Sequence, residues 1–535
     1  MKEDGWSQVI DSNHLFKGAM FMKQYSDLEF LRLSRWGKFS YRLNSFFCGI
    51  PQGIKNALFG AGRFFKKLGR GIGGEFGELF RTFREGDWKT RASYLVMGFG
   101  SMARGQIMRG LMFLLFEIVF IVYMTLPTGG LFWLKKLCTL GDHGVTKVTE
   151  VVYGQTVEKV IPGDNSFRIL LYGVLTIFFI VAFIYTWRLN VRQNRIAEGI
   201  LKSGKKLKSG KDDLRSLVDE QFYKTLLALP LTGIVVFTVM PIVFMVLVAF
   251  TNYDGTHDGA NNLFTWVGLD NFNTLLSWQG GNNVYSAAFG EILSWTLIWA
   301  FFATFTNYFL GMFVAMMINK KGIKLKKLWR TVLVLTIAIP QFISLLYVGK
   351  MFAKNGLVNL SLINLGWIRP GQELPFWEEP SWARITAIVV NIWIGIPYLM
   401  LVATGILMNI PQDLYESSRI DGANAWQQYT KITLPYMLFI TGPYLLTSFT
   451  GNMNNFNVIY LLTGGAPTNA RLSTAAGSVG HTDLLITWLF KITTGAESKY
   501  YMASVVGIMV FVVVAVISLV VYNLLPSIKN EEDFQ

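Results

Sequence analysis

The sequence predicts an all-α polytopic membrane protein with eight transmembrane helices. Of its 535 residues, 52% are hydrophobic and only 16% are charged, which excludes most water-soluble multidomain enzymes. The hydrophobic residues also gather into stretches of about 20 residues, the length that a helix needs to cross roughly 30 Å of hydrocarbon. The two cysteines, Cys48 and Cys138, are too few for a disulfide framework and lack the spacing of zinc ligands.

Apolar windows place the eight spans in order along the chain. They are expected at residues 107–126, 169–187, 225–250, 290–318, 328–352, 384–409, 434–456 and 500–525. Pro241 and Pro340 fall inside two of these windows and should kink them, because proline frees a carbonyl of the preceding turn. The second half of the seventh window is too polar to face lipid, so we expect it to face a cavity or another helix.

The distribution of basic residues predicts the orientation. Of the 49 Lys and Arg residues, 36 fall before the first span, between alternate spans or after the last span, whereas the loop 251–289 contains none. Basic loops resist translocation, so both termini are expected in the cytoplasm. The net charge of +15 is thus explained by basic residues on the cytoplasmic side of the membrane, and no nucleic acid partner is expected.

The first part of the chain, residues 1–104, is expected to be a cytoplasmic basic amphipathic segment. Apolar and basic residues recur at helical spacing within 54–72, which favours a segment lying on anionic lipid. Its many glycines leave a plain linker as the alternative. Residues 105–224 then hold two transmembrane helices and a basic linker, and residues 225–526 hold the remaining six helices.

Motifs for several kinds of catalysis are missing. The nearest candidate for a phosphate loop, from Gly204 to Asp212, is out of register and has Asp212 where a hydroxyl belongs. Neither H-E-x-x-H nor G-x-S-x-G occurs. Glu117 lies in the first span without an apparent carboxylate or histidine partner for a proton relay. It is therefore either a functional residue, as intramembrane acids commonly are, or an acid that pairs with a second subunit or is protonated. We therefore expect no enzyme activity, no cofactor and no metal in this chain.

The loop 410–435, between the sixth and seventh spans, has a sequence that predicts two short helices joined by a turn. A helix can begin near Pro411, and the Asp421-Gly422 step allows a sharp turn before a second short helix. Ala423 and Trp426 then share one helical face with Tyr429. Such an apolar face needs a partner, either another protein or, as the alternative, the lipid surface.

This loop resembles the EAA loop of bacterial ABC importer permeases. The pattern E-A-A-x-x-x-G, nine residues, I-x-L-P is matched in register by Glu416, Gly422, Ile432, Leu434 and Pro435. Serines 417 and 418 replace the two usual alanines. Further stretches, at 389–398, 453–456, 464–467 and 480–485, resemble permeases of the maltose/maltodextrin, MalF type, so the resemblance covers roughly residues 220–525.

The resemblance implies one subunit of a larger machine. It implies an ABC type I importer permease core, preceded by two extra helices, in an ATP-driven importer of maltodextrin-like oligosaccharides in the bacterial plasma membrane. The implied partners are a MalG-like permease, a MalK-like ATPase dimer that uses ATP and Mg, and an extracytoplasmic sugar-binding protein. The residues implied to transmit ATPase motion are Glu416, Asp421, Gly422, Ala423 and Trp426.

A sugar site can be argued partly from the residues themselves. A neutral oligosaccharide needs uncharged hydrogen-bonding groups, which spans six and seven supply, although such groups also join neighbouring helices. Together with the resemblance, this predicts substrate contacts from Asn391, Ile394, Gly395, Tyr398, Ser448, Gly451, Asn452 and Asn455. Gly451 stands where MalF-type permeases commonly have an aromatic residue, which predicts a wider site.

Two other classes of protein fit the sequence less well. An ion-coupled secondary transporter or channel should show repeated halves and intramembrane charges, which we do not find by eye. A membrane enzyme would need a cluster of acid, base or metal-binding residues. The loop 410–435 favours the importer permease over both.

Overall fold

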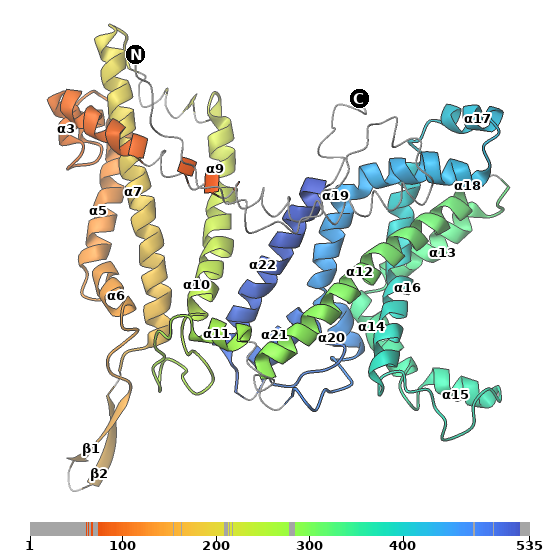
Figure 1. Ribbon diagram of the computed structural model, residues 1–535. Coiled ribbons are helices and arrows are strands. Elements are labelled where there is room, and N and C mark those ends of the chain that lie inside the picture. The colour runs from red at the N-terminus through yellow and green to blue at the C-terminus, as the bar shows by residue number, and fades with distance from the viewer. Residues whose placement is uncertain are drawn as a thin grey trace, which may run out of the picture. The chain divides into compact units, whose positions relative to one another are not determined.

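The computed structural model shows a largely helical, multi-pass membrane protein (Figure 1). Among the described residues, seven helices are long and apolar enough to cross a membrane, and a bent helix pair makes an eighth span. The prediction of eight helical spans is therefore confirmed. The structure describes residues 60, 62–63, 66–67, 73–152, 155–161, 163–207, 212, 215–216, 218–277, 284–320, 322–473, 477–495 and 497–524.

The spans correspond to the predicted windows, and several extend beyond them. They are α5 (Ile107–Thr125), α7 (Ser166–Lys202), α9 to α10 (Phe222–Ile234, a π-helical turn Val235–Val239, and Met240–Val248), α12 (Val284–Asn319), α13 with α14 (Lys326–Ala338 and Gln341–Met351), α16 (Pro380–Leu407), α18 to α19 (Ala425–Gln428, a π-helical turn Tyr429–Thr433, and Leu434–Met453) and α22 (Tyr500–Leu524). Shorter helices are α3 (Trp88–Ala92), α4 (Phe99–Met102), α6 (Gly130–Leu137), α11 (Asp270–Leu276), α15 (Leu357–Asn364), α17 (Gln412–Ile420), α20 (Phe456–Leu462) and α21 (Leu485–Thr494).

The two prolines predicted to kink their spans behave differently. At Pro340 the chain bends by 92° between α13 and α14, so the fifth window is a broken span. The residue before it, Ile339, is extended, as the clash with a following proline ring favours. Pro241 lies in the first turn of α10, directly after the π-helical turn Val235–Val239, and the span continues through it.

One β-hairpin interrupts the helices and was not predicted. Strands β1 (Thr146–Val152) and β2 (Gln155–Ile161) pair antiparallel, from Thr146 opposite Ile161 to Val152 opposite Gln155. Figure 1 shows the hairpin extending away from α5 and α7. Both strands are short, mixed polar and β-branched stretches, which a search for long apolar windows passes over.

The packing centre of the last six spans is α12, which contacts both α16 and α19. Its apolar window is 44% buried, against 6% for the span Phe222–Val248. Gly311 allows this close packing, because a Cβ there would lie 2.7 Å from the Cβ of Leu399. Met312, Met400 and Met437 are fully buried at the same junction.

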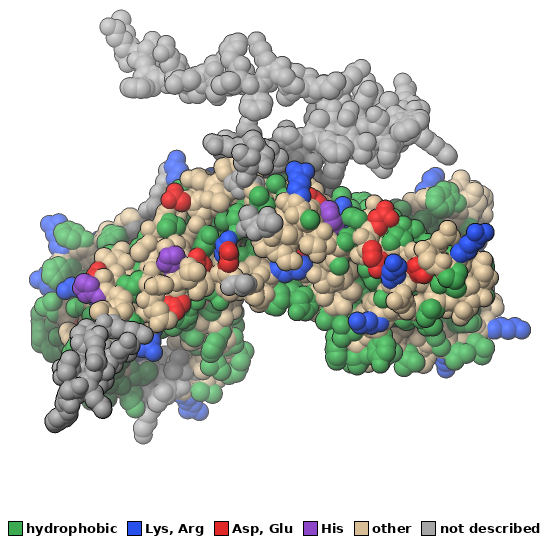
Figure 2. Space-filling view, turned by 90° about the horizontal axis from the view of Figure 1, so that it is seen from below, with side chains coloured by type: hydrophobic (Ala, Val, Ile, Leu, Met, Phe, Trp, Pro, Cys, Tyr) green, Lys and Arg blue, Asp and Glu red, His purple; other side chains and the backbone are tan. Residues whose placement is uncertain are grey.

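Hydrophobic side chains cover the flanks of the helices, whereas charged and polar ones gather on the end face that Figure 2 shows. Many large apolar side chains on the spans are exposed, as on Phe237, Leu229 and Phe511. This distribution is what a bilayer requires, because lipid-facing helix surfaces stay apolar and charges collect at the water interfaces.

The segment before α5 packs against the membrane helices. Residues 73–85 form a helix, and α3 and α4 contact α5 and α7. Glu117 accepts a hydrogen bond from the Met97 backbone N–H at 2.8 Å, so it has a main-chain partner that the sequence did not predict. The partner comes from a loop 20 residues earlier, which no local pattern reveals. The predicted lipid-lying segment 54–72 falls almost entirely outside the described residues.

Candidate functional site

Polar side chains from α12 and α19 meet inside the helix bundle. Asn452 donates from Nδ2 to Thr304 Oγ1 at 3.0 Å, and Asn455 donates from Nδ2 to Asn452 Oδ1 at 3.4 Å. The predicted seventh span thus turns its polar half toward another helix. An uncharged chain of amides and a hydroxyl can donate to and accept from a neutral ligand, because each amide has unused lone pairs or N–H groups.

The third helix of this cluster is α16, where Asn391 is only 6% exposed and its Nδ2 has no partner among the described residues. One turn later Gly395 lies against Asn307 of α12: a Cβ at 395 would be 2.3 Å from Asn307 Nδ2. Glycine is therefore required for this close approach. The Asn307 Oδ1 is also without a partner in this part of the chain. Unsatisfied buried polar atoms cost about 1–3 kcal/mol each, and such a cost is typical of functional positions.

The remaining predicted substrate residues are more open. Tyr398 is exposed, and a Cβ on Gly451 would meet nothing within 4 Å. Ser448 is half-buried near Tyr444, and Ile394 packs against the apolar cluster around Trp299. The predicted set thus lies on α16 and α19, which both pack on α12, and at Asn455 just before α20. It has a buried part and an open part.

Sequence reasoning missed the contribution of α12. Thr304 and Asn307 complete the polar cluster, and Tyr308 on the same helix shares a 2.8 Å hydrogen bond with Thr441 of α19. These three polar residues, close together in a largely apolar window, were the available signal. That signal shows that the window has a non-lipid face, but only the helix packing shows which helix it meets.

The loop 410–435 folds as two short helices at one end of the bundle, α17 and α18 (Figure 1). Gly422 joins them with φ +80, a left-handed conformation that favours glycine. Asn424 then caps α18 through a reciprocal pair of hydrogen bonds with Gln427, both of 2.8 Å. The predicted sharp turn at Asp421-Gly422 is confirmed.

Hydrogen bonds hold the two short helices together. Tyr415 on α17 bonds through its hydroxyl to Thr433 Oγ1 at 2.8 Å, and Gln428 Nε2 donates to Ser418 Oγ at 3.0 Å. Ser418 is one of the two serines that replace the usual alanines, so its hydroxyl supplies a contact that alanine lacks.

The outer surface of this loop exposes large apolar side chains. Ile420 is 87% exposed and Trp426 is 70% exposed, and the Trp426 ring lies 5.6 Å from that of Tyr429. Glu416 and Asp421 are also exposed, and Ala423 is half-buried. Exposed large apolar side chains beside charged ones are typical of a protein interaction site.

Comparison with known proteins identifies the family. The profile of the family described as "Binding-protein-dependent transport system inner membrane component" matches residues 307–530. The maltodextrin permease MalC of Streptococcus pneumoniae (strain TIGR4) is 32% identical over 446 residues, which cover 82% of this chain and 96% of MalC. The maltodextrin permease MdxF and the galactooligosaccharide permease GanP, both of Bacillus subtilis, are each 32% identical, with 95% and 97% of their lengths covered. This chain belongs to that family of ABC importer permeases.

In this permease, the matched residues 307–530 include Asn307, the polar positions of α16 and α19, and the loop with α17 and α18. Residues before α12, with α5, α7 and the hairpin, lie outside the family profile. The curated permeases named above extend over most of the chain, so the additional helices are a feature that they share in sequence.

The stretches 464–467 and 480–485, which also resemble MalF-type permeases, pack together beside α20 and α21. Asp483 is fully buried and accepts hydrogen bonds from Lys491 Nζ and the Gly480 N–H, both at 2.7 Å. Burial raises the pKa of Asp483, and Lys491 opposes this shift. Gly465 (φ +90) permits the contact, since a Cβ there would lie 2.2 Å from the Asp483 carboxylate. Among the described residues, no group of three His, Cys, Asp or Glu side chains is placed to hold a metal.

Proposed function

We propose that this permease forms half of the translocation pathway of an ATP-driven importer of maltodextrin-like oligosaccharides. The observation that carries the proposal is the uncharged polar cluster on α12, α16 and α19, built around the Asn452–Thr304 hydrogen bond. Hydroxyl-rich neutral sugars are recognised by such amides and hydroxyls. The names of the most similar curated permeases, which transport maltodextrins or galactooligosaccharides, agree with this substrate class.

The substrate contacts are proposed to be the eight predicted residues together with Thr304 and Asn307. Tyr398 and Gly451 face open space, so this chain supplies one wall of the pathway. A second, MalG-like permease would supply the opposite wall. An extracytoplasmic sugar-binding protein would deliver the oligosaccharide at the end of the bundle away from α17.

The short helices α17 and α18 are proposed to dock into a MalK-like ATPase dimer, which binds the ATP and Mg. The exposed apolar surface of Ile420 and Trp426 would fill a groove on the ATPase, and Glu416 and Asp421 would contact its rim. Because Gly422 holds the two helices at a defined angle, ATPase closure would move them as one unit and shift α16 and α19. This assignment places both termini in the cytoplasm, in agreement with the basic loops.

The test is ATP-dependent uptake of labelled maltodextrins into proteoliposomes that contain this permease with its candidate partner permease, ATPase and binding protein. Gly422→Pro should abolish uptake, because proline holds φ near −65°. Gly366→Pro is the matched control: Gly366 has φ +72, open surroundings and the same type of turn hydrogen bond, but lies beside α15. Uptake that needs all four components and survives Gly366→Pro supports the proposal.

The alternative is an ion-coupled secondary transporter or channel. It would take up sugar without ATP or the ATPase, and Gly422→Pro would have no larger effect than Gly366→Pro. Either result would overturn the coupled importer.

A further inference from the structure

A basic face continues α7 beyond its apolar part. The apolar run of this helix ends at Trp187, and Arg188, Arg192 and Arg195 follow it. Their spacing of four and three residues places the three guanidinium groups on one side of the helix. Since the apolar run occupies the hydrocarbon, this face begins at the depth of the lipid headgroups.

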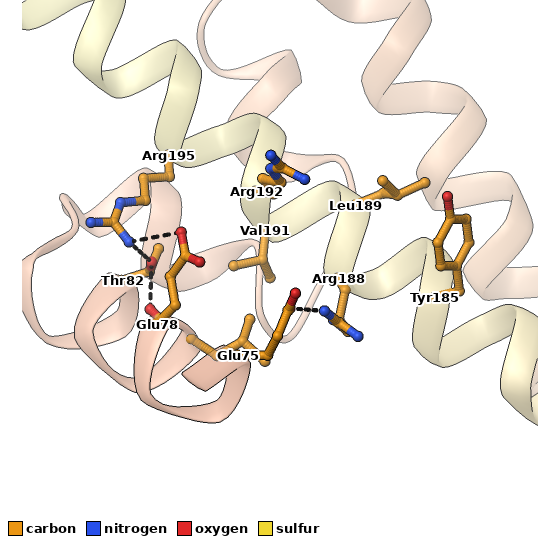
Figure 3. Close-up of a pocket in the computed structure, with 10 residues that line it drawn as sticks. Glu75, Glu78, Thr82, Tyr185, Arg188, Leu189, Val191, Arg192 and Arg195 are labelled. Atoms are coloured by element: carbon orange, nitrogen blue, oxygen red, sulfur yellow. Dashed lines mark hydrogen bonds and ion pairs between the residues drawn. The ribbon is translucent and has the colours of Figure 1, made fainter. Parts of the chain in front are cut away.

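The arginines line a pocket of about 330 Å³ between α7 and the helix of residues 73–85. Figure 3 shows Arg188 and Arg195 reaching toward that helix, with Tyr185 at the side nearest the apolar run. Three arginines face two glutamates, Glu75 and Glu78, so the lining has an excess of positive charge.

The ion pairs across the pocket leave the basic face only partly neutralised. Glu75 pairs with Arg188, and Glu78 lies 3.4 Å from Arg195, which also donates to Thr82 Oγ1 at 2.8 Å. Both carboxylates are exposed, and exposed ion pairs contribute little stability. Among the described residues, Arg192 has no ion pair at all.

An exposed aromatic stripe lies beside the pocket. Phe76 and Phe80 are 69% and 70% exposed, and Phe83 lies one turn further along the same helix face. The Phe83 ring lies 5.2 Å from that of Tyr94, which lies 5.5 Å from the ring of Trp187. The stripe is therefore connected to the end of the apolar run of α7.

We infer that this pocket binds the phosphate-bearing headgroup of an anionic phospholipid, with the phenylalanine stripe among its acyl chains. Arginine is suited to phosphate because its planar guanidinium donates two parallel hydrogen bonds. Free phosphate shares this chemistry, but the exposed phenylalanines and the depth of Trp187 favour a ligand that also has acyl chains. With the orientation that the basic loops predict, the lipid belongs to the cytoplasmic leaflet. The inference does not depend on the transported substrate.

The experiment measures retained lipid. The full chain, purified in mild detergent with the subunits that remain bound, is incubated with labelled phosphatidylglycerol or phosphatidylcholine, and the lipid that co-elutes is counted. The wild type should retain phosphatidylglycerol in preference to phosphatidylcholine. Arg188→Gln with Arg192→Gln should lower the affinity for phosphatidylglycerol by about fivefold for each arginine. The control, Lys324→Gln with Lys327→Gln, removes the same charge around the start of α13 and should change little.

A second variant separates ligand binding from structural support. Glu75→Gln with Glu78→Gln frees the arginines, so it should raise phosphatidylglycerol retention, whereas loss of purely structural ion pairs would not. The inference is overturned if the wild type retains both lipids equally, or if the lysine control loses as much phosphatidylglycerol as the arginine variant. It is also overturned if Glu75→Gln with Glu78→Gln leaves phosphatidylglycerol retention unchanged or lowers it. Displacement of the lipid by millimolar inorganic phosphate would assign the pocket to soluble phosphate instead, which also overturns it.

Discussion

Asn452 of α19 and Thr304 of α12 are joined by a 3.0 Å hydrogen bond, although 148 residues separate them in the chain. This bond connects the helix that leads out of the loop 410–435 to the helix at the packing centre. Asn452, in the proposed sugar site, lies on the same continuous span as the π-helical turn Tyr429–Thr433, namely α18 to α19. A displacement of the loop therefore reaches the polar cluster along a single span, which contains the π-helical turn and Pro443.

Removing the Thr304 hydroxyl should weaken sugar uptake. Thr304→Val keeps the side-chain shape but leaves Asn452 without this acceptor, which should raise the KM for maltodextrin uptake roughly 2–10-fold, the equivalent of one hydrogen bond. Thr306→Val is the control, because the hydroxyl of the half-buried Thr306 donates to the Phe302 carbonyl of its own helix. Equal KM values for the two variants would remove Thr304 from the proposed site.

Adding a ring at Gly451 should change which sugars are transported. A Cβ at this position would meet no atom within 4 Å, so Gly451→Phe should fold normally and narrow the site. We expect the preference to shift toward shorter oligosaccharides, measured as the ratio of uptake rates for two chain lengths. Gly405→Phe, at a second open helical glycine, is the control. An unchanged ratio would contradict the wide site predicted at Gly451.

Truncating Trp426 should weaken association with the ATPase without harming the fold. The side chain is 70% exposed, so Trp426→Ala removes little internal packing, but an exposed aromatic anchor contributes about 2 kcal/mol or more to an interface. We expect at least a tenfold loss of affinity in pull-down or biolayer measurements with the candidate ATPase. Trp367→Ala, at a position that is 76% exposed beside α15, should bind normally. Normal binding by both variants would exclude Trp426 from the interface.

Glu117 should prove structural. Glu117→Gln keeps an acceptor for the Met97 N–H and should preserve both stability and uptake, whereas Glu117→Leu leaves this buried N–H unpaired at a cost of about 1–3 kcal/mol. Thermal unfolding of the purified chain measures the difference. Loss of uptake in Glu117→Gln with unchanged stability would instead indicate a proton relay, and with it a secondary transporter.

The segment before α5 should loosen in acid. Burial works to raise the pKa of Asp87, but hydrogen bonds from Thr90 and Arg104 outweigh it and hold the pKa below the usual 3.8. A depressed pKa means that the carboxylate stabilises the fold at neutral pH and that this contribution is lost as the pH falls below about 4. Asp87→Asn should therefore unfold at a lower temperature than the wild type at pH 7, and the gap should narrow at pH 3.5. A gap that is constant with pH would contradict the role of the Asp87 charge.

The sequence alone determined the membrane architecture and the family. Long apolar runs must be helices that cross a bilayer, because only internal hydrogen bonding satisfies the backbone there, and the register from Glu416 to Pro435 is local. The turn at Gly422 was likewise readable, since it depends on a single residue's backbone. Each of these features depends on residues that are close together in the chain.

Only the tertiary structure decided how distant residues combine. It placed Thr304 and Asn307 of α12 beside the predicted positions on α16 and α19, and it supplied Met97 as the partner of Glu117. It also showed that Pro340 breaks its span by 92° whereas Pro241 does not, although both prolines lie within apolar windows. These outcomes depend on which helix faces pack together, and packing is a property of the whole chain that no single window contains.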